Sequence, residues 1–273
     1  MKSKRSIIGT IILLSWVVVS VWPIWHFATI ALRPRVEIIA PDPIYWPTFT
    51  TETWAKIWDE WPMMKYFFNS IASVAGSVVI CLLLGIPAAY SLARYRYKGR
   101  EDIGNYILST KMMAPVVVAI PLYVMFARFR MLDTIWALML VYAAINLSIV
   151  VWIIRSYMVD IPHEIEDAAR TDGASDLRIL WEIIIPMCLP GIITAAVIAS
   201  VFAMNEYMLT LIIGRKEAYT MSIALGNFKG GSDGIIYNAI ALIAFMAFFP
   251  ILALVISIQN HLSRGLTMGA VKG

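Results

Sequence analysis

Apolar residues are concentrated in six uncharged or nearly uncharged runs. Each run is close to the roughly 20 residues that a helix needs to cross the hydrocarbon core of a bilayer. Because lipid offers no partner for backbone N–H and C=O groups, each run is expected to be helical. The pattern predicts an all-α integral membrane bundle of six transmembrane helices that forms one domain over residues 1–273. The expected spans are 7–32, 67–93, 103–127, 135–154, 183–205 and 235–258.

The third run is the least regular, because it contains Lys111 and two prolines, Pro115 and Pro121. A lysine at the bilayer centre costs about 2.5–3.5 kcal/mol on insertion scales. We therefore expect the membrane portion to begin near Met112, and Lys111 to lie near the cytoplasmic end with its ammonium reaching lipid phosphate. A place on a transport path is the alternative for this lysine.

Composition supports a membrane protein. The chain is 60% hydrophobic and 15% charged, whereas soluble domains carry about 25% charged residues. The mean hydropathy is +0.75. A net charge of +4 is too small and too dispersed for a nucleic-acid groove, so no nucleic-acid partner is expected. Cys81 and Cys188 lie in or beside apolar stretches and are expected to be buried small side chains.

The basic residues indicate how the bundle is oriented. They cluster before the first span, within 2–5, and in the short connection 94–100. Since cytoplasmic loops carry an excess of Lys and Arg, both segments are predicted to be cytoplasmic, and six spans return the C-terminus to the same side. Arg128 and Arg130 do not fit the rule that basic residues are cytoplasmic, because this topology places them outside.

The connection 155–182 between the fourth and fifth spans carries the most specific local signals. Pro162 suits the first position of a helix, and the acidic residues that follow it favour a helix N-terminus. Gly173 tolerates the left-handed conformation that ends many helices, and Ser175 can then cap a second helix. The sequence therefore predicts a cytoplasmic hairpin of two short helices around a tight turn.

The hairpin has two interpretations on composition alone. It can be a docking element, because Ala168 and Ala169 leave room for another surface to approach. It can equally be a solvated amphipathic loop.

A longer motif covers this hairpin. Residues 167–169 read D-A-A; Gly173 follows after three residues, and 183–186 follow after nine more. This spacing resembles the E-A-A, three residues, G, nine residues, I-x-L-P signature of permease subunits in ATP-binding-cassette importers. Asp167 replaces the usual Glu, and Ile185 replaces the usual Leu.

The C-terminal residues 264–273, R-G-L-T-M-G-A-V-K-G, resemble the tail of the second permease of maltose-type carbohydrate importers. In that family the tail reaches the cytoplasmic ATPases. Further resemblance lies at Asn69 and Ser70, at 112–121 and at 205–207, and together these segments extend it over most of the chain from Asn69 onward.

The resemblance implies a set of partners and a docking surface. The partners are a homologous second permease, two ATPase subunits, an extracytoplasmic solute-binding protein, a sugar-like substrate and membrane lipid. ATP and Mg would be bound by the ATPases, and this chain would bind no cofactor. The hairpin would be the coupling element, and its expected ATPase-docking residues are Glu164, Glu166, Asp167, Ala168, Ala169, Asp172 and Gly173.

Polar residues inside or at the ends of spans are candidates for the substrate path. Asn205, Glu206 and Tyr207 combine an amide, a carboxylate and an aromatic ring that could bind and stack on a sugar, although an interfacial anchor also explains them. Asn146 is a further candidate, with a hydrogen bond to a neighbouring helix as the alternative.

Several functions lack the residues that they need. No G-x-x-x-x-G-K-[ST] loop is present, and His26, His163 and His261 lie far apart without metal-ligand spacing, so no metal site and no catalytic site are expected. A gradient-driven transporter, the alternative function, should show intramembrane acids and internal repeats. We therefore expect a non-catalytic permease subunit of a carbohydrate importer in a bacterial-type inner membrane, with both termini cytoplasmic.

Overall fold

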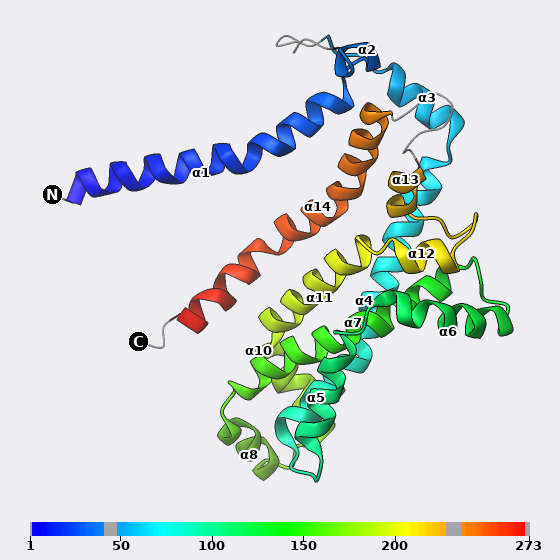
Figure 1. The fold of residues 1–273 in the computed structure, drawn as a ribbon. Helices are drawn as coiled ribbons and strands as arrows, with labels where there is room; N and C mark the ends of the chain where they lie inside the picture. Colours follow the sequence, from blue (N-terminus) through cyan, green and yellow to red (C-terminus); the bar gives the residue numbers. More distant parts are fainter. Residues whose placement is uncertain (1, 41–47, 228–235, 271–273) are drawn as a thin grey trace. The chain divides into compact units, whose positions relative to one another are not determined.

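The computed structural model describes residues 2–40, 48–227 and 236–270 (Figure 1). Within these ranges the chain forms helices and no strand, as the apolar runs predict. In chain order the elements are α1 (Lys2–Ala31), α2 (Arg35–Ile38), α3 (Glu52–Glu60), α4 (Met63–Arg94), α5 (Arg100–Thr110), α6 (Pro115–Arg128), α7 (Ile135–Val159), α8 (His163–Thr171), α9 (Asp176–Ile179), the π-helical turn η1 (Leu180–Ile184), α10 (Ile185–Met187), α11 (Leu189–Met204), α12 (Met208–Ile213), α13 (Met221–Asn227) and α14 (Tyr237–Ala270).

Four of the described helices, α1, α4, α7 and α14, are each long and apolar enough to cross a membrane. Two further spans result if each of two bent helix pairs is one span. The first pair is α5 with α6, which meet at 90°, and the second is Asp176–Met187 with α11, which meet at 76°. The predicted all-α membrane bundle is confirmed, but its third and fifth spans are not straight.

The predicted third span, 103–127, is broken where α5 ends and α6 begins. Ala114 has an extended backbone (φ −64°, ψ 132°), the conformation that a residue before proline favours. Pro115 is the first residue of α6. It cannot continue the preceding helix, because proline has no N–H to donate and its ring clashes with the preceding turn. The helix is therefore broken within residues 103–127, and α6 begins three residues after Met112, near which the membrane portion is expected to begin.

The second helix of the hairpin leads into the predicted fifth span, as expected. Helical structure starts at Asp176 and runs through residue 183, and it bends at Cys188 before α11. Pro186 and Pro190 flank the bend and remove two N–H donors from the helix. At the C-terminus α14 continues to Ala270, so residues 259–270 of the predicted tail extend that helix; 271–273 lie outside the described residues.

Contacts divide the chain into two units, Met1–Lys65 with Ala224–Phe248 and Tyr66–Ile223 with Phe249–Gly273. In the first unit Asn238 Nδ2 donates to the carbonyl oxygen of Arg33 (3.2 Å) and to Thr53 Oγ1 (2.6 Å). These bonds join the start of α14 to the segments around α2 and α3. This division into two units does not test whether residues 1–273 form a single domain, so the single domain stays a prediction.

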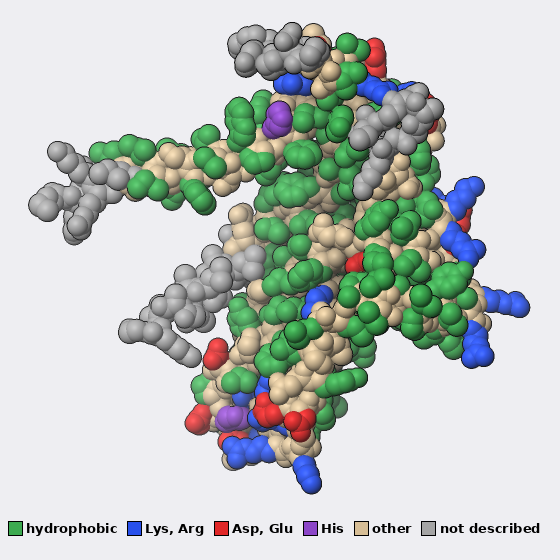
Figure 2. All heavy atoms as spheres, in the orientation of Figure 1, with side chains coloured by type: hydrophobic (Ala, Val, Ile, Leu, Met, Phe, Trp, Pro, Cys, Tyr) green, Lys and Arg blue, Asp and Glu red, His purple; other side chains and the backbone are tan. Residues whose placement is uncertain are grey.

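The second unit is organised around α7, which carries many buried side chains and packs against α11 and α5. Small residues let the helices of this unit approach closely. At Gly76 of α4, an added Cβ would lie 2.5 Å from Met139 Sδ of α7. On α11, Ala195, Ala199 and Ala203 are all buried. Figure 2 shows apolar side chains over the middle of this unit and charged ones gathered near α5 and α8.

A carboxylate holds the connection after α12 in place. Asp133, in the left-handed region (φ 60°) between α6 and α7, accepts hydrogen bonds from the backbone N–H groups of residues 215–218 at 2.8–3.2 Å. Burial alone would raise the pKa of the Asp133 carboxyl, but these four N–H donors hold that pKa below its usual range. Arg215 Nη2 also donates to Tyr123 Oη at 2.8 Å. The turn before α7 is therefore a fixed support for this loop.

Candidate functional site

The connection between α7 and α11 folds as the predicted hairpin. Gly173 has φ +84°, and its N–H donates to the Arg170 carbonyl oxygen at 3.0 Å. The Ala174 N–H donates to the Ala169 carbonyl oxygen at 3.0 Å, which completes a Schellman motif at the end of α8. Ser175 Oγ accepts from the Arg178 N–H (3.4 Å) and caps α9. The two-helix hairpin and its left-handed glycine are confirmed, although α8 begins one residue after Pro162.

The hairpin is attached to the end of α4 by a buried ion pair. Glu166 of α8 pairs with Arg94, the last residue of α4, through a carboxylate oxygen and Nε. The two side chains are only 1% and 2% exposed. Removing one partner of such a pair leaves a buried, uncompensated charge, which typically costs about 3–5 kcal/mol. The position of α8 is thus tied to the position of α4.

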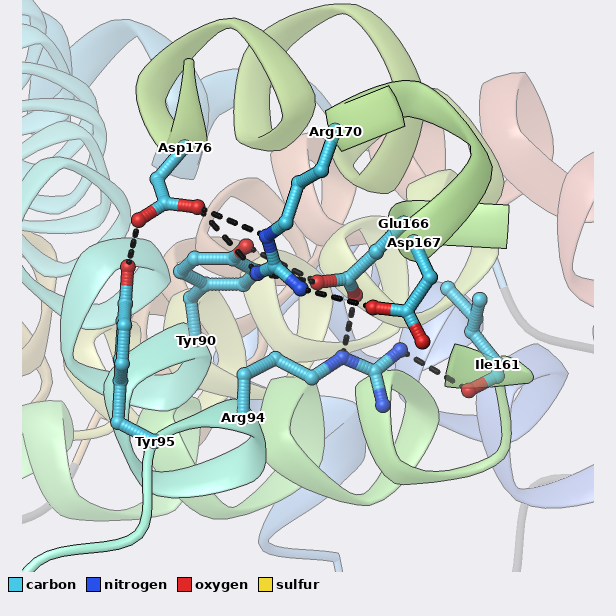
Figure 3. Close-up of polar contacts among 8 residues, drawn as sticks. All are labelled: Tyr90, Arg94, Tyr95, Ile161, Glu166, Asp167, Arg170 and Asp176. Atoms are coloured by element: carbon cyan, nitrogen blue, oxygen red, sulfur yellow. Dashed lines mark hydrogen bonds and ion pairs between the residues drawn. The ribbon is translucent and has the colours of Figure 1, made fainter. Parts of the chain in front are cut away.

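Further contacts surround this pair (Figure 3), and they include Arg170 Nη2, which lies 3.6 Å from Glu166 Oε2. Tyr90 Oη donates to the second carboxylate oxygen of Glu166 at 3.1 Å. Arg94 Nη2 donates to the carbonyl oxygen of Ile161, in the turn that precedes α8, at 2.9 Å. Arg94 therefore holds both α8 and the turn leading into it.

Arg170 forms an outer layer that links the two helices of the hairpin (Figure 3). Its guanidinium lies 3.1 Å from Asp167 Oδ1 on α8 and 3.3 Å from Asp176 Oδ1 on α9. Tyr95 Oη donates to the other oxygen of Asp176 at 2.8 Å. Burial, and then the hydrogen bond to Asp176, raise the pKa of the Tyr95 hydroxyl, so this group stays protonated as a donor near neutral pH.

The hairpin exposes most, but not all, of the residues expected to dock on an ATPase. Ala169 is half-buried and packs on the core, whereas Ala168 faces outward. Glu166 differs from the expectation of a contact residue, because its carboxylate is turned inward onto Arg94 and supports the hairpin from behind. The exposed residues of the set are Glu164, Asp167, Ala168, Asp172 and Gly173.

Sequence reasoning missed the residues that hold the hairpin. Arg94 was included only in the basic segment that indicates orientation, and Tyr90 and Tyr95 carried no signal. Glu166 and Arg94 are 72 positions apart, so no local pattern connects them. An acidic residue facing the core side of a short amphipathic helix is the one feature that could have indicated a buried partner.

The substrate-path candidates lie directly after α11 and within α7. Asn205 is exposed and donates to the Val201 carbonyl oxygen (2.7 Å), and Tyr207 is exposed. Glu206 is half-buried, and its carboxylate accepts the Leu209 N–H at 2.9 Å, at the start of α12. None of these contacts tests a transport role. Asn146 is buried, and its Nδ2 donates to its own helix at Tyr142.

Lys111 does not take the predicted place at lipid phosphate. Its Nζ donates to Asn146 Oδ1 (3.0 Å) and to the Ile145 carbonyl oxygen (3.2 Å), both on α7. Its side chain thus turns toward the bundle. This is possible because α5 ends at Thr110 and the chain changes direction after Lys111. The snorkelling interpretation is wrong, and the structure pairs Lys111 with a predicted path residue.

Cys81 and Cys188 are buried free thiols, as their apolar surroundings predict. In the part of the chain that the structure describes, no three His, Cys, Asp or Glu side chains lie together in a metal-binding arrangement.

Comparison with known proteins places this architecture among transport components. Residues 63–268 match the family described as "Binding-protein-dependent transport system inner membrane component". The trehalose transport system permease protein SugB of Mycobacterium tuberculosis (strain CDC 1551 / Oshkosh) is 32% identical over 207 residues, which is 75% of this chain and 76% of that protein. The diacetylchitobiose uptake system permease protein DasC of Streptomyces coelicolor (strain ATCC BAA-471 / A3(2) / M145) is 29% identical over 259 residues, which is 93% of this chain and 92% of that protein.

A solved structure has the same fold. A chain from the crystal structure of a bacterial ABC transporter involved in the import of the acidic polysaccharide alginate superimposes with a TM-score of 0.74. The alignment covers 95% of this chain and 98% of that chain at 20% identity, a level at which the likeness concerns the fold alone.

Proposed function

This chain belongs to the family of binding-protein-dependent transport system inner membrane components, and we propose that it is the channel-forming permease subunit of an ATP-driven carbohydrate importer. Family membership confirms the prediction of a non-catalytic, multi-pass subunit of the inner membrane. One observation supports a carbohydrate as the substrate class. Relatives that align over 75% and 93% of the chain are named for trehalose and diacetylchitobiose.

The hairpin supports a mechanism for coupling. Its exposed face, which carries Asp167, Ala168 and Asp172, would bind an ATPase subunit. Because Glu166 and Arg94 tie α8 to the end of α4, a displacement of the hairpin would be carried into a membrane helix instead of being absorbed by a loose loop. ATP-driven closure of the ATPases would then open the bundle outward, and hydrolysis would return it.

The proposed mechanism requires several partners. A homologous second permease would complete the channel, two ATPase subunits would bind ATP and Mg, and an extracytoplasmic solute-binding protein would deliver the sugar. This chain would bind no nucleotide, because its sequence contains no phosphate-binding loop.

Reconstitution tests this division of labour. We expect the complex of this chain with its partner permease, ATPases and binding protein to hydrolyse ATP and to import a sugar into proteoliposomes. The same chain purified alone should show neither ATP binding nor hydrolysis. Hydrolysis by the isolated chain, or sugar uptake that depends on an ion gradient and not on ATP, would contradict the proposal.

We also propose that both termini and the hairpin are cytoplasmic. In a background with Cys81 and Cys188 replaced by Ser, Asp172→Cys should react with a membrane-impermeant maleimide only after the membrane is opened. Lys216→Cys, in the loop that Asp133 holds, should react in intact cells. Labelling of Asp172→Cys from outside would reverse the topology and remove the docking role of the hairpin.

A further inference from the structure

Lys111 is a cation at a break inside a membrane segment. It is the residue that follows α5, and the chain turns by 90° before α6 begins. The next residue, Met112, is 86% exposed, so other parts of this chain do not cover the break. Placing a charge inside a membrane segment costs free energy, and such a residue usually serves a function.

The ammonium group of Lys111 is held by neutral partners. Two of its three N–H donors are used by Asn146 Oδ1 at 3.0 Å and the Ile145 carbonyl oxygen at 3.2 Å. Asn146 is itself fixed, because its amide nitrogen donates to the Tyr142 carbonyl oxygen at 3.0 Å. The position of Nζ is thus set by α7, one of the most buried helices of the described chain.

No carboxylate among the described residues neutralises this charge directly, since none lies within 4.0 Å of Nζ. The charge of Glu206 acts on Lys111 from a greater distance, and its carboxylate is engaged at Leu209. A buried or half-buried cation that bonds only to dipoles remains able to gain from an anion, because hydrogen bonds between ionised groups are about twice as strong as neutral ones.

An aromatic ring lies beside the ammonium. Phe202 of α11 has its ring centroid 4.3 Å from Nζ, and the side chain is 47% exposed. The cation therefore lies over one face of the Phe202 ring, while the exposed part of the side chain is free to contact another molecule. A cation next to an open aromatic face can bind a ring that carries an acidic group, with the apolar face of that ring against Phe202.

We propose that Lys111 and Phe202 form a substrate subsite for an anionic carbohydrate, in which Lys111 binds a carboxylate, sulfonate or phosphate group and Asn146 positions the lysine. This proposal rests on the proposed importer function and narrows its substrate class to acidic sugars. It also assigns a role to Asn146, which becomes a positioning residue on the substrate path.

The test uses the reconstituted complex and defined probes. The acidic probes are glucuronate, digalacturonate and glucose 6-phosphate, and their neutral counterparts are glucose and galactobiose. We expect the wild-type complex to import at least one acidic probe. Lys111→Gln keeps a donor toward Asn146 but removes the charge, so it should raise KM for that probe by about tenfold or more. Lys111→Arg should stay within a few fold of wild type.

The controls separate binding from folding and from coupling. Lys98→Met removes one exposed positive charge outside the membrane and should leave KM unchanged. The membrane level of Lys111→Gln should match that of wild type. Absence of ATP hydrolysis in the wild-type complex would overturn the importer function itself. Import of neutral probes only, import of no acidic probe, or an equal KM for wild type and Lys111→Gln would overturn the subsite.

Discussion

Replacing Glu166 by Gln is expected to destabilise the hairpin strongly and to lower ATP-driven uptake by about tenfold or more. The substitution leaves the Arg94 guanidinium buried with no counter-charge, and breaking a buried pair in this way costs about 3–5 kcal/mol. Arg94→Met should have a smaller effect in the same direction, because the carboxylate of Glu166 then loses its buried partner but keeps Arg170 at 3.6 Å. Thermal unfolding of the purified complex, ATPase co-purification and uptake measure the three consequences.

A double variant distinguishes the ion pair from its two members. Arg94→Met combined with Glu166→Met removes both charges, and such replacements are often close to neutral for stability. We therefore expect thermal stability, and with it part of the uptake, to return in the double variant. Additive losses would show that the two residues act independently.

An exposed pair in the same segment provides the matched control. Arg178 and Glu182 also form an ion pair, at 2.8 Å, but their side chains are 65% and 60% exposed. Water screens such a pair, so Glu182→Gln should leave stability and uptake close to wild type. Equal effects of Glu166→Gln and Glu182→Gln would mean that burial of the pair has no part in coupling.

Gly173→Val is expected to uncouple the subunit while leaving it in the membrane. Gly173 has φ +84°, a conformation that costs a residue with a Cβ about 1–2 kcal/mol, and more for a β-branched one. Beyond Gly173 and its two chain neighbours, no atom lies within 4 Å of an added Cβ, so the effect would come from the backbone and not from a clash. The Schellman turn would shift, and α8 and α9 would lose their relative placement. Membrane level should stay normal, while ATPase co-purification or sugar-stimulated hydrolysis falls by about tenfold.

Two variants separate local strain from loss of the hairpin. Gly173→Asn should be tolerated better, because Asn adopts the left-handed region more readily. Gly99, between α4 and α5, has the same φ of +84° and the same open surroundings. Gly99→Val therefore carries equal strain at a turn outside the hairpin, and it should keep coupling. A Gly99→Val defect as large as that of Gly173→Val would indicate a general effect of strain.

The docking face can be tested without changing the backbone. Ala168 is exposed on α8, so Ala168→Trp should fold normally and block an approaching ATPase by its size. Wild-type uptake in both Ala168→Trp and Gly173→Val would remove the hairpin from the coupling mechanism.

Several features could be predicted because they depend on short stretches of chain. The apolar runs determined where helices lie, since a segment in lipid has to satisfy its own backbone groups. Gly173 and Ser175 likewise determined the turn of the hairpin, because a left-handed cap and a side-chain cap involve residues only a few positions apart. The bends at Ala114 and Cys188 were harder to predict. The nearby prolines indicate that a helix is interrupted, but they do not give the direction of the helix that follows.

The helical membrane class, the position of the hairpin and the family motif within it can thus be read from the order of the residues. Which faces of those elements meet depends on how the chain packs in three dimensions. Glu166 is a buried anchor and not a docking contact because α8 packs with that face on the end of α4, and Arg94 lies 72 positions away. Lys111 contacts Asn146 and not lipid because the chain turns at the end of α5. The reason is physical: local conformation follows from neighbouring residues, whereas the partner of a charge depends on packing between segments that are distant in the chain.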